Sequence, residues 1–141
     1  MKILVAAICD HCWVESGCLS VFRTFDSVNA ANFPFTLSRI SVALRLLIGK
    51  SEYGAHKLVI ALSDSDGNKL MNSEININFQ PPNDYLPETA FSFALNGQNI
   101  IFSKPGDYAV DILVDGEVKA GVPLYVREKK GGQGIDIPDR I

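Results

Sequence analysis

Three cysteines and a histidine near the amino terminus are the residues of this chain best suited to chemistry. Cys9 and Cys12 enclose Asp10 and His11, and Cys18 follows. Thiolates and imidazole are the ligands that Zn²⁺ prefers, and paired thiols can also exchange with disulfides. A structural zinc site needs a second ligand pair, however, and residues three apart on an extended strand face opposite sides. We therefore expect buried or edge cysteines in a reducing compartment, with metal or thiol chemistry at Cys9, His11, Cys12 and Cys18 as the alternative.

A second chemical candidate is the acidic turn that begins at Asp64. Asp64, Asp66 and Asn68 alternate as oxygen ligands do at the start of a calcium loop. The twelfth position of such a loop needs a Glu, and Ile75 stands there instead. These residue types are also typical of tight turns, so we expect a hairpin turn without an ion.

Nucleophilic catalysis has little support in the sequence. The histidines are His11 and His56, and the chain has neither a Gly-x-Ser-x-Gly elbow nor a phosphate-binding glycine loop before a helix. We therefore expect a protein that is not an enzyme and that needs no cofactor.

Composition places the chain among ordinary globular domains. Its 141 residues are 47% hydrophobic and 21% charged, which is enough for one domain with a core that needs neither metal nor disulfides. The net charge of -3 argues against binding to a phosphate backbone, which needs a clustered positive surface.

The apolar amino terminus is too short for a secretion signal. The apolar run before Cys9 is only six residues long, whereas a signal needs roughly 7–15, and Ile8 is a poor residue for a cleavage site. No other stretch approaches the roughly 20 apolar residues of a membrane helix, so we expect a cytoplasmic protein whose first strand is Ile3–Cys9.

Alternating apolar and polar residues, separated by turn residues, predict an antiparallel sandwich. An Asn96-Gly97 turn is expected to separate two of its strands, and Phe33-Pro34-Phe35 is expected to plug one end, with a helical turn at 27–31 as an option. Trp13 is expected in a loop. The predicted strands are Ile3–Cys9, Leu19–Phe25, Val42–Ile48, Leu58–Leu62, Ile75–Phe79, Phe91–Leu95, Ile100–Phe102, Tyr108–Val114 and Val118–Val126.

The segment from Lys104 to Tyr108 predicts a strand-entry corner. Pro105-Gly106 turns the chain, and a tyrosine placed directly after it is typical of immunoglobulin-like sandwiches, where its hydroxyl bonds back to the upstream backbone. Tyr108 should point inward together with Val110, Ile112 and Val114. A tight Asp115-Gly116 turn should then lead into the last strand, in which Val118, Ala120, Val122, Leu124 and Val126 should point inward.

The last strand and the tail are where we expect partners to bind. Pro123 predicts an edge or a bulge, because proline cannot donate to a sheet ladder. The sandwich domain should span residues 1–127, followed by a glycine-containing tail, 128–141. Isoleucines two apart in that tail suit strand addition to the same domain, a second copy or a partner. The candidate partner-binding residues are Pro123, Tyr125, Ile135, Ile137 and Ile141.

Several pieces of the chain together resemble a family of small bacterial proteins known only as a domain of unknown function. They include Ala7-Ile8-Cys9-Asp10, Phe33-Pro34, Pro105-Gly106-x-Tyr108 and Asp115-Gly116. The resemblance spans about residues 1–127 and implies no activity or site residue. Cys12 and Cys18 lie outside its pattern.

The sequence therefore predicts an all-β protein, an antiparallel immunoglobulin-like β-sandwich of seven to nine strands. We expect a non-catalytic protein-interaction module, which binds a protein partner or self-associates through an edge strand or its tail. One alternative is a sandwich that binds carbohydrate or a small ligand, which would need exposed coplanar aromatics. The outward positions are mostly polar, with Trp13 and Tyr125 as exceptions. The other alternative is zinc- or thiol-dependent chemistry at Cys9 and Cys12.

Overall fold

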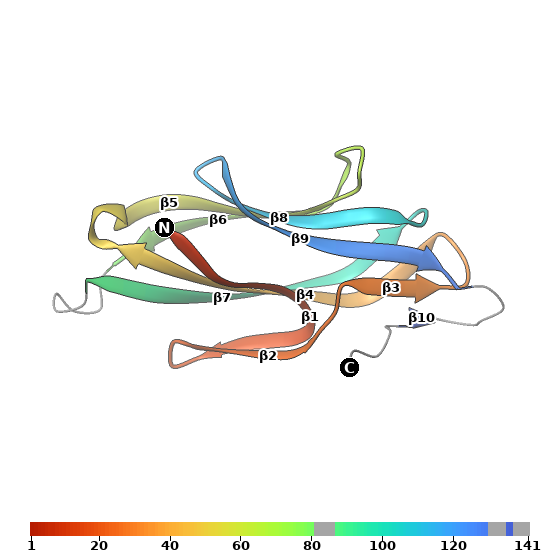
Figure 1. The fold of residues 1–141 in the computed structure, drawn as a ribbon, viewed down its shortest axis with the longest axis horizontal. Coiled ribbons are helices and arrows are strands. Elements are labelled where there is room, and N and C mark those ends of the chain that lie inside the picture. Colours follow the sequence, from red (N-terminus) through yellow and green to blue (C-terminus); the bar gives the residue numbers. More distant parts are fainter. Residues whose placement is uncertain (81–86, 130–134, 137–141) are drawn as a thin grey trace.

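A computed structural model describes residues 1–80, 87–129 and the backbone of 135–136. These residues form an all-β fold of two sheets with one short 3-10 helix, η1 (Lys50–Glu52) (Figure 1). The strands are β1 (Lys2–Glu15), β2 (Cys18–Thr24), β3 (Ser27–Ala30), β4 (Phe35–Gly49), β5 (Gly54–Ser63), β6 (Lys69–Phe79), β7 (Glu88–Phe102), β8 (Gly106–Val114), β9 (Glu117–Glu128) and β10 (Ile135–Asp136). No helix in the described part of the chain is long and apolar enough to cross a membrane.

The two sheets have the strand orders β2-β1-β4-β7 and β10-β3-β9-β8-β5-β6. The pairing is antiparallel except between β3 and β9, where Ser27 lies beside Tyr125 and Ala30 beside Glu128 in parallel. The two-sheet all-β prediction is confirmed, but a purely antiparallel pattern and a helical turn at 27–31 were wrong. Both errors concern β3, which is four residues long and too short to show a clear alternation.

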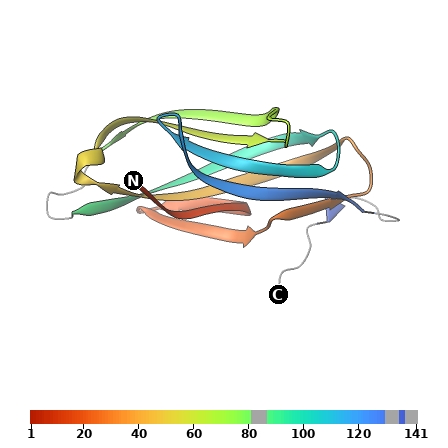
Figure 2. The same cartoon turned by 45° about the horizontal axis from the view of Figure 1, so that its top comes forward.

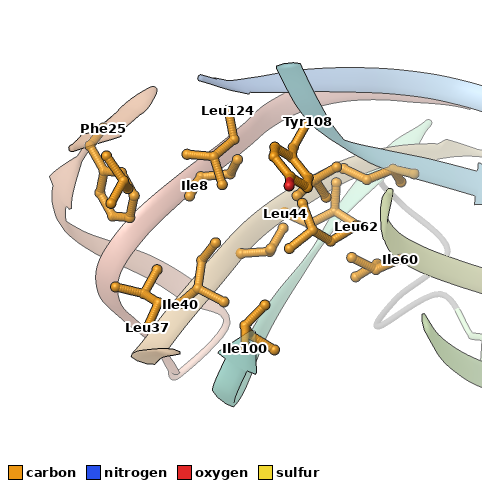
Figure 3. Close-up of a cluster of buried hydrophobic side chains, with 14 of the residues drawn as sticks. Ile8, Phe25, Leu37, Ile40, Leu44, Ile60, Leu62, Ile100, Tyr108 and Leu124 are labelled. Carbon is orange, nitrogen blue, oxygen red and sulfur yellow. The ribbon is translucent and has the colours of Figure 1, made fainter. Parts of the chain in front are cut away.

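The core lies between the two sheets and is built from the alternating apolar residues of both. Leu44 of β4 and Ile60 and Leu62 of β5 are fully buried there. Figure 3 shows their side chains converging on the same interior as Ile8 of β1 and Tyr108 of β8. Because successive residues of a strand point to opposite faces, each strand contributes every second side chain to this core.

The first strand does not end at Cys9, as predicted, but bends there. Cys9 pairs with Ser41 of β4 on one side and begins the pairing with β2 on the other. Beyond it, β1 and β2 form a hairpin that lies on the side of β4 and β7 away from β5 and β8 (Figures 1 and 2). At the hairpin tip, the Gly17 carbonyl accepts hydrogen bonds from Arg45 (3.0 Å) and Ser92 (3.3 Å). Trp13, expected in a loop, therefore lies in a strand.

The predicted Asn96-Gly97 turn was also wrong, because β7 continues through it. Gly97 pairs with Ile40 of β4 within an uninterrupted ladder. A Cβ at this position would lie 2.8 Å from Met71 Sδ and 3.3 Å from Ile40 Cγ2. The glycine therefore permits a close approach between strands of the two sheets. Such an approach is a common reason for a glycine inside a strand.

The last strand contains a bulge that reverses one predicted side chain. Ile112 pairs with Ala120, whereas the next residue, Leu113, pairs with Val118, so Lys119 is the extra residue on β9. An inserted residue shifts the alternation of the strand by one. Val118, expected to point inward, is therefore 60% exposed, while Leu124 and Val126 beyond the bulge are fully buried as predicted.

The predicted tyrosine corner is confirmed. The Tyr108 hydroxyl donates a hydrogen bond of 2.7 Å to the Lys104 carbonyl, and the ring is buried edge-on against Phe102 at 5.0 Å between centroids. The Asp115-Gly116 turn is confirmed as well, with φ of 52° and 82° at its two residues. This combination of positive φ values is the one that matches the twist of a two-residue hairpin.

We predict that Tyr108→Phe lowers the free energy of unfolding by about 1 kcal/mol, because it removes one hydrogen bond from a buried corner and leaves the ring packing intact. Urea denaturation measures the change. Tyr125→Phe is the matched control, since that ring is exposed on β9, and it should leave the stability unchanged. Equal stabilities of the two variants would contradict this role of the corner.

Candidate functional site

Cys9 and Cys12 lie together in a small core beneath the β1–β2 hairpin. They pack with Ala43 of β4, and Leu19 and Ala94 border the cluster. The expectation that two residues three apart face opposite sides was wrong, because β1 bends between them. The Cys9 thiol lies 3.7 Å from the Ser41 carbonyl oxygen.

This environment makes both thiols poor nucleophiles. Burial, reinforced by the neighbouring Cys12, raises the pKa of the Cys9 thiol to about 12. Burial also raises the pKa of Cys12. The thiolate is the reactive and metal-binding form, so a raised pKa suppresses both kinds of chemistry at neutral pH.

The other two candidate ligands do not complete a metal site. Cys18 is exposed at the start of β2, while the two remaining cysteines are buried. The Nδ1 atom of His11 is buried and has no hydrogen-bond partner among the described residues. No group of three or more His, Cys, Asp or Glu side chains gathers in the part of the chain that the structure describes. Of the four candidate ligands, Cys9 and Cys12 belong to one packing cluster, and His11 and Cys18 are not part of it.

We predict that Cys18 alone reacts with a thiol reagent in the folded protein, because it is exposed and the other two thiols are buried with raised pKa values. Absorbance with Ellman's reagent should show one fast thiol per chain and two more after denaturation in urea. Cys18→Ser should abolish the fast phase, and fast labelling of that variant would contradict the burial of the pair.

The turn at Asp64 binds its own backbone. Asp64 Oδ1 accepts hydrogen bonds of 2.9 Å from the N–H groups of both Asp66 and Asn68. Its other oxygen accepts a bond of 3.1 Å from the Asn68 side chain. The carboxylate therefore closes the turn between β5 and β6, as the sequence predicted.

His56 is held between two acceptors in a way that the sequence did not reveal. Its Nδ1 lies 2.6 Å from Asp115 Oδ2, and its Nε2 lies 2.6 Å from the Glu52 carbonyl oxygen. A carboxylate and a carbonyl both accept, so both ring nitrogens must donate, and the imidazole is protonated in this arrangement. Asp115 also accepts the N–H of Lys57 at 2.9 Å. We call His56, Asp115 and the Glu52 carbonyl the His56 clasp.

The His56 clasp joins three separate parts of the chain. It connects the β8–β9 turn at Asp115 to the start of β5 and to η1, whose Glu52 carboxylate binds the terminal ammonium of Met1. The hydrogen bond to Asp115 raises the pKa of His56. The Lys57 N–H and then His56 lower the pKa of Asp115. Asp115 lies half exposed beside an open pocket of about 360 Å³, which Asn76 and Asn78 also line.

We predict that the His56 clasp stabilises the protein at acidic pH and weakens as the pH rises. The folded pKa of His56 lies above its unfolded value near 6.5, so the stabilisation is complete below that value and is lost as the pH rises through the folded pKa. His56→Gln should therefore destabilise more at about pH 5.5 than at about pH 9, measured by urea denaturation. Asp115→Asn keeps the turn and should reduce the pH dependence in the same way. An equal loss at both pH values would contradict the clasp.

The outer face of the β1–β2 hairpin displays aromatic side chains. Trp13 is 43% exposed and Phe22 is 56% exposed, and His11 pairs with Phe22 across the two strands. Trp13 was evident from the sequence as an exposed aromatic, whereas Phe22 was not, because both faces of β2 carry apolar residues. The rings of His11 and Trp13 are 5.3 Å apart and tilted by 32°, so these two do not form the coplanar surface that the carbohydrate alternative requires.

Pro123 does not lie on an edge strand of its sheet. Pro123 was expected at an edge or a bulge. β9 is an interior strand between β8 and β3, so the edge was wrong, and the bulge of this strand lies at Lys119 rather than at Pro123. β3 pairs only with the stretch that begins at Tyr125, whose N–H bonds the Asp26 carbonyl at 2.7 Å. Backbone N–H groups two positions apart on a strand point to the same side, so the Pro123 nitrogen points toward β3, as the Tyr125 N–H does. Pro123 lies before the stretch that pairs with β3, and the proline therefore costs no hydrogen bond to β8. Tyr125 is exposed, with the Arg127 guanidinium 5.5 Å from its ring centre.

The tail adds a strand to its own domain. Ile135 pairs with Ala30 and Asp136 with Asn29, antiparallel to β3, so β10 is the edge of the larger sheet. The sequence left open whether this strand adds to the same domain, to a second copy or to a partner. In the structure it adds to the same domain. Ile137 and Ile141 lie outside the described residues.

The two-sheet fold and its corner define a small all-β domain. The chain belongs to the family of unknown function DUF6941, which matches residues 4–127. The resemblance seen in the sequence is thereby confirmed. A search of curated proteins finds no match.

Three solved structures that resemble this fold do so at low similarity. The Pseudomonas fluorescens alkylpurine DNA glycosylase AlkC bound to DNA is 15% identical, with 86% of this chain and 30% of that chain covered and a TM-score of 0.43. A glycosyl hydrolase family 2 member from Bacteroides cellulosilyticus is 14% identical, with 72% and 15% covered and a TM-score of 0.37. A β-glucuronidase of the same family is 14% identical, with 73% and 13% covered and a TM-score of 0.36. The chain spans less than a third of each, and similarity at this level carries no functional argument.

Proposed function

We propose that this domain is a non-catalytic protein-interaction module that recognises an extended segment by strand addition at the outer edge of β3. The observation that carries the proposal is the pairing of Ile135 and Asp136 with that edge. In strand addition, main-chain hydrogen bonds supply the affinity, and alternate side chains supply the specificity.

The geometry of β3 suits such a role. Val28 and Ala30 are buried in the core and hold the strand in register, while Asn29 lies between them on the other face. The Lys129 N–H bonds the Ala30 carbonyl at 2.8 Å, so the chain leaves β9 close to the end of β3. Ile135 follows six positions after Lys129, so the tail competes for this edge at a high effective concentration. A partner strand must therefore bind better than the tail to replace it.

An immunoglobulin-like sandwich is the finer fold that we propose for this module. β1, β4 and β7 would take the places of strands A, B and E, and β5, β8 and β9 those of strands C, F and G. The strand orders of the two sheets support this assignment, as does the hydrogen bond of Tyr108 at the corner before β8. The binding edge would then lie beside strand G, on β3.

A cytoplasmic location is part of the proposal. Cys9, Cys12 and Cys18 are free thiols. Free cysteines persist in reducing compartments, whereas secreted domains of small size tend to pair them.

We predict that deletion of residues 130–141 lowers the melting temperature, because it removes β10 and exposes the backbone of β3. It retains Lys129 and its bond to Ala30. A synthetic peptide of residues 133–141 should restore the melting temperature and bind the truncated protein in calorimetry. Deletion of 137–141 alone, which spares β10, is the control and should have a smaller effect.

Two outcomes would separate strand addition from a general effect of the tail. A scrambled peptide of the same composition should neither bind nor stabilise. An unchanged melting temperature after the longer deletion, together with no binding of the native peptide, would overturn the proposed function.

A further inference from the structure

One side of the sandwich is closed less tightly than the rest in the described residues. β7 is the edge of the smaller sheet and β6 the edge of the larger one opposite β10. Six of the apolar residues that these strands direct toward the core are only half buried, although Phe79 of β6 and Ile100 and Phe102 of β7 are buried like Leu44 and Ile60 of the interior strands. We call the half-buried set the β6–β7 seam, and its members are Met71, Ile75, Ile77, Phe91, Phe93 and Leu95.

The edge of β7 lacks the usual protection against pairing. From Thr89 to Phe102 the strand carries no charged residue. Natural sheets shield their edges with charges, prolines or short strands, and an edge strand without them is a template for another strand. The other edges differ in this respect: β6 carries Lys69 and Glu74, β2 carries Arg23, and β10 has only two residues.

The lack of charge on β7 also indicates which kind of partner strand could pair with this edge. A two-fold axis brings each residue near the axis close to its own copy, so a charged strand repels itself and an uncharged strand does not. β7 spans 15 residues, long enough for an extended ladder about an axis at its middle residue, Leu95. Pairing there would also bring the two copies of the β6–β7 seam together and bury the apolar area that each leaves half exposed.

We propose that β7 pairs antiparallel with β7 of a second copy of this chain, which joins the two smaller sheets into one continuous sheet across a two-fold axis. This interface is separate from the β3 edge and needs no residue of the tail. It extends β-augmentation, in which an open sheet edge receives a strand, to a symmetric pair.

Asn96→Asp is the variant that tests this pairing most directly. Asn96 is exposed on β7, and its Oδ1 accepts a hydrogen bond from Ser41 Oγ at 2.5 Å, which an aspartate can also accept. With the axis at Leu95, the two copies of residue 96 become diagonal neighbours about 7 Å apart. Two carboxylates at that distance should weaken the dimer by about tenfold.

Sedimentation velocity over a range of concentrations gives the dimer dissociation constant. The wild-type chain should dimerise, and Asn96→Asp should weaken the dimer. Asn76→Asp is the matched control: it adds the same charge at an exposed position of β6 and should leave the constant unchanged. Circular dichroism and melting verify that each variant is folded.

A charge-reversal experiment makes the test independent of folding defects. Asn96→Lys alone should also weaken the dimer, and mixing it with Asn96→Asp should give heterodimers in native mass spectrometry. The chain without residues 130–141 should dimerise as the full chain does, which distinguishes this interface from the β3 edge. A wild-type protein that stays monomeric, or a dimer that Asn96→Asp leaves intact, would overturn the proposal.

Discussion

The burial of β4 on both faces is the constraint on which the rest of this structure depends. Its inner residues, such as Leu44 and Leu46, fill the core between the sheets, and its outer residue Ala43 is equally inaccessible. A strand covered on both faces has to pack against two layers, and here the second layer is supplied by the β1–β2 hairpin. Small outer side chains at Ser41 and Ala43 make room for the two cysteines of β1. Ser41 is fully buried, and its hydroxyl contacts Asn96 across the ladder.

This arrangement explains why residue types that suggest chemistry serve packing here. Cys9 and Cys12 lie where a small polarizable side chain fits between two strands, and desolvation holds the thiols protonated. Asp64 closes the turn between β5 and β6 through the backbone N–H groups that it accepts. The contacts of Asp64, of the Tyr108 corner and of the His56 clasp thus lie at turns and corners, where they connect neighbouring segments of the chain.

Among the described residues, the sheet edges and one aromatic face stand out at the surface. The β3 edge carries β10, the β7 edge is long and uncharged from Thr89 onward, and the hairpin displays Trp13 and Phe22. A small sandwich with two sheets has four edge strands, and each must be covered, charged or used. Because an edge binds through the backbone, it leaves little trace in the side chains, which is why a binding function of this kind is hard to recognise from motifs.

Much of the fold could be predicted from the sequence alone, because alternation, turn residues and the Tyr108 corner are local patterns. The inward face of β8 and the Asp115-Gly116 turn depend on residues close to one another in the chain, and both were predicted correctly. The tertiary structure decided what depends on distant residues. The sequence Asn96-Gly97 indicates a turn, and only the tertiary structure shows that Met71 of the other sheet packs against Gly97. His56 has no evident role in the sequence, because its partner Asp115 lies 59 positions further along the chain. The bend of β1 at Cys9, the interior position of β9 and the placement of the tail on β3 belong to the same class, because each follows from which strands become neighbours and not from the residues of any one strand.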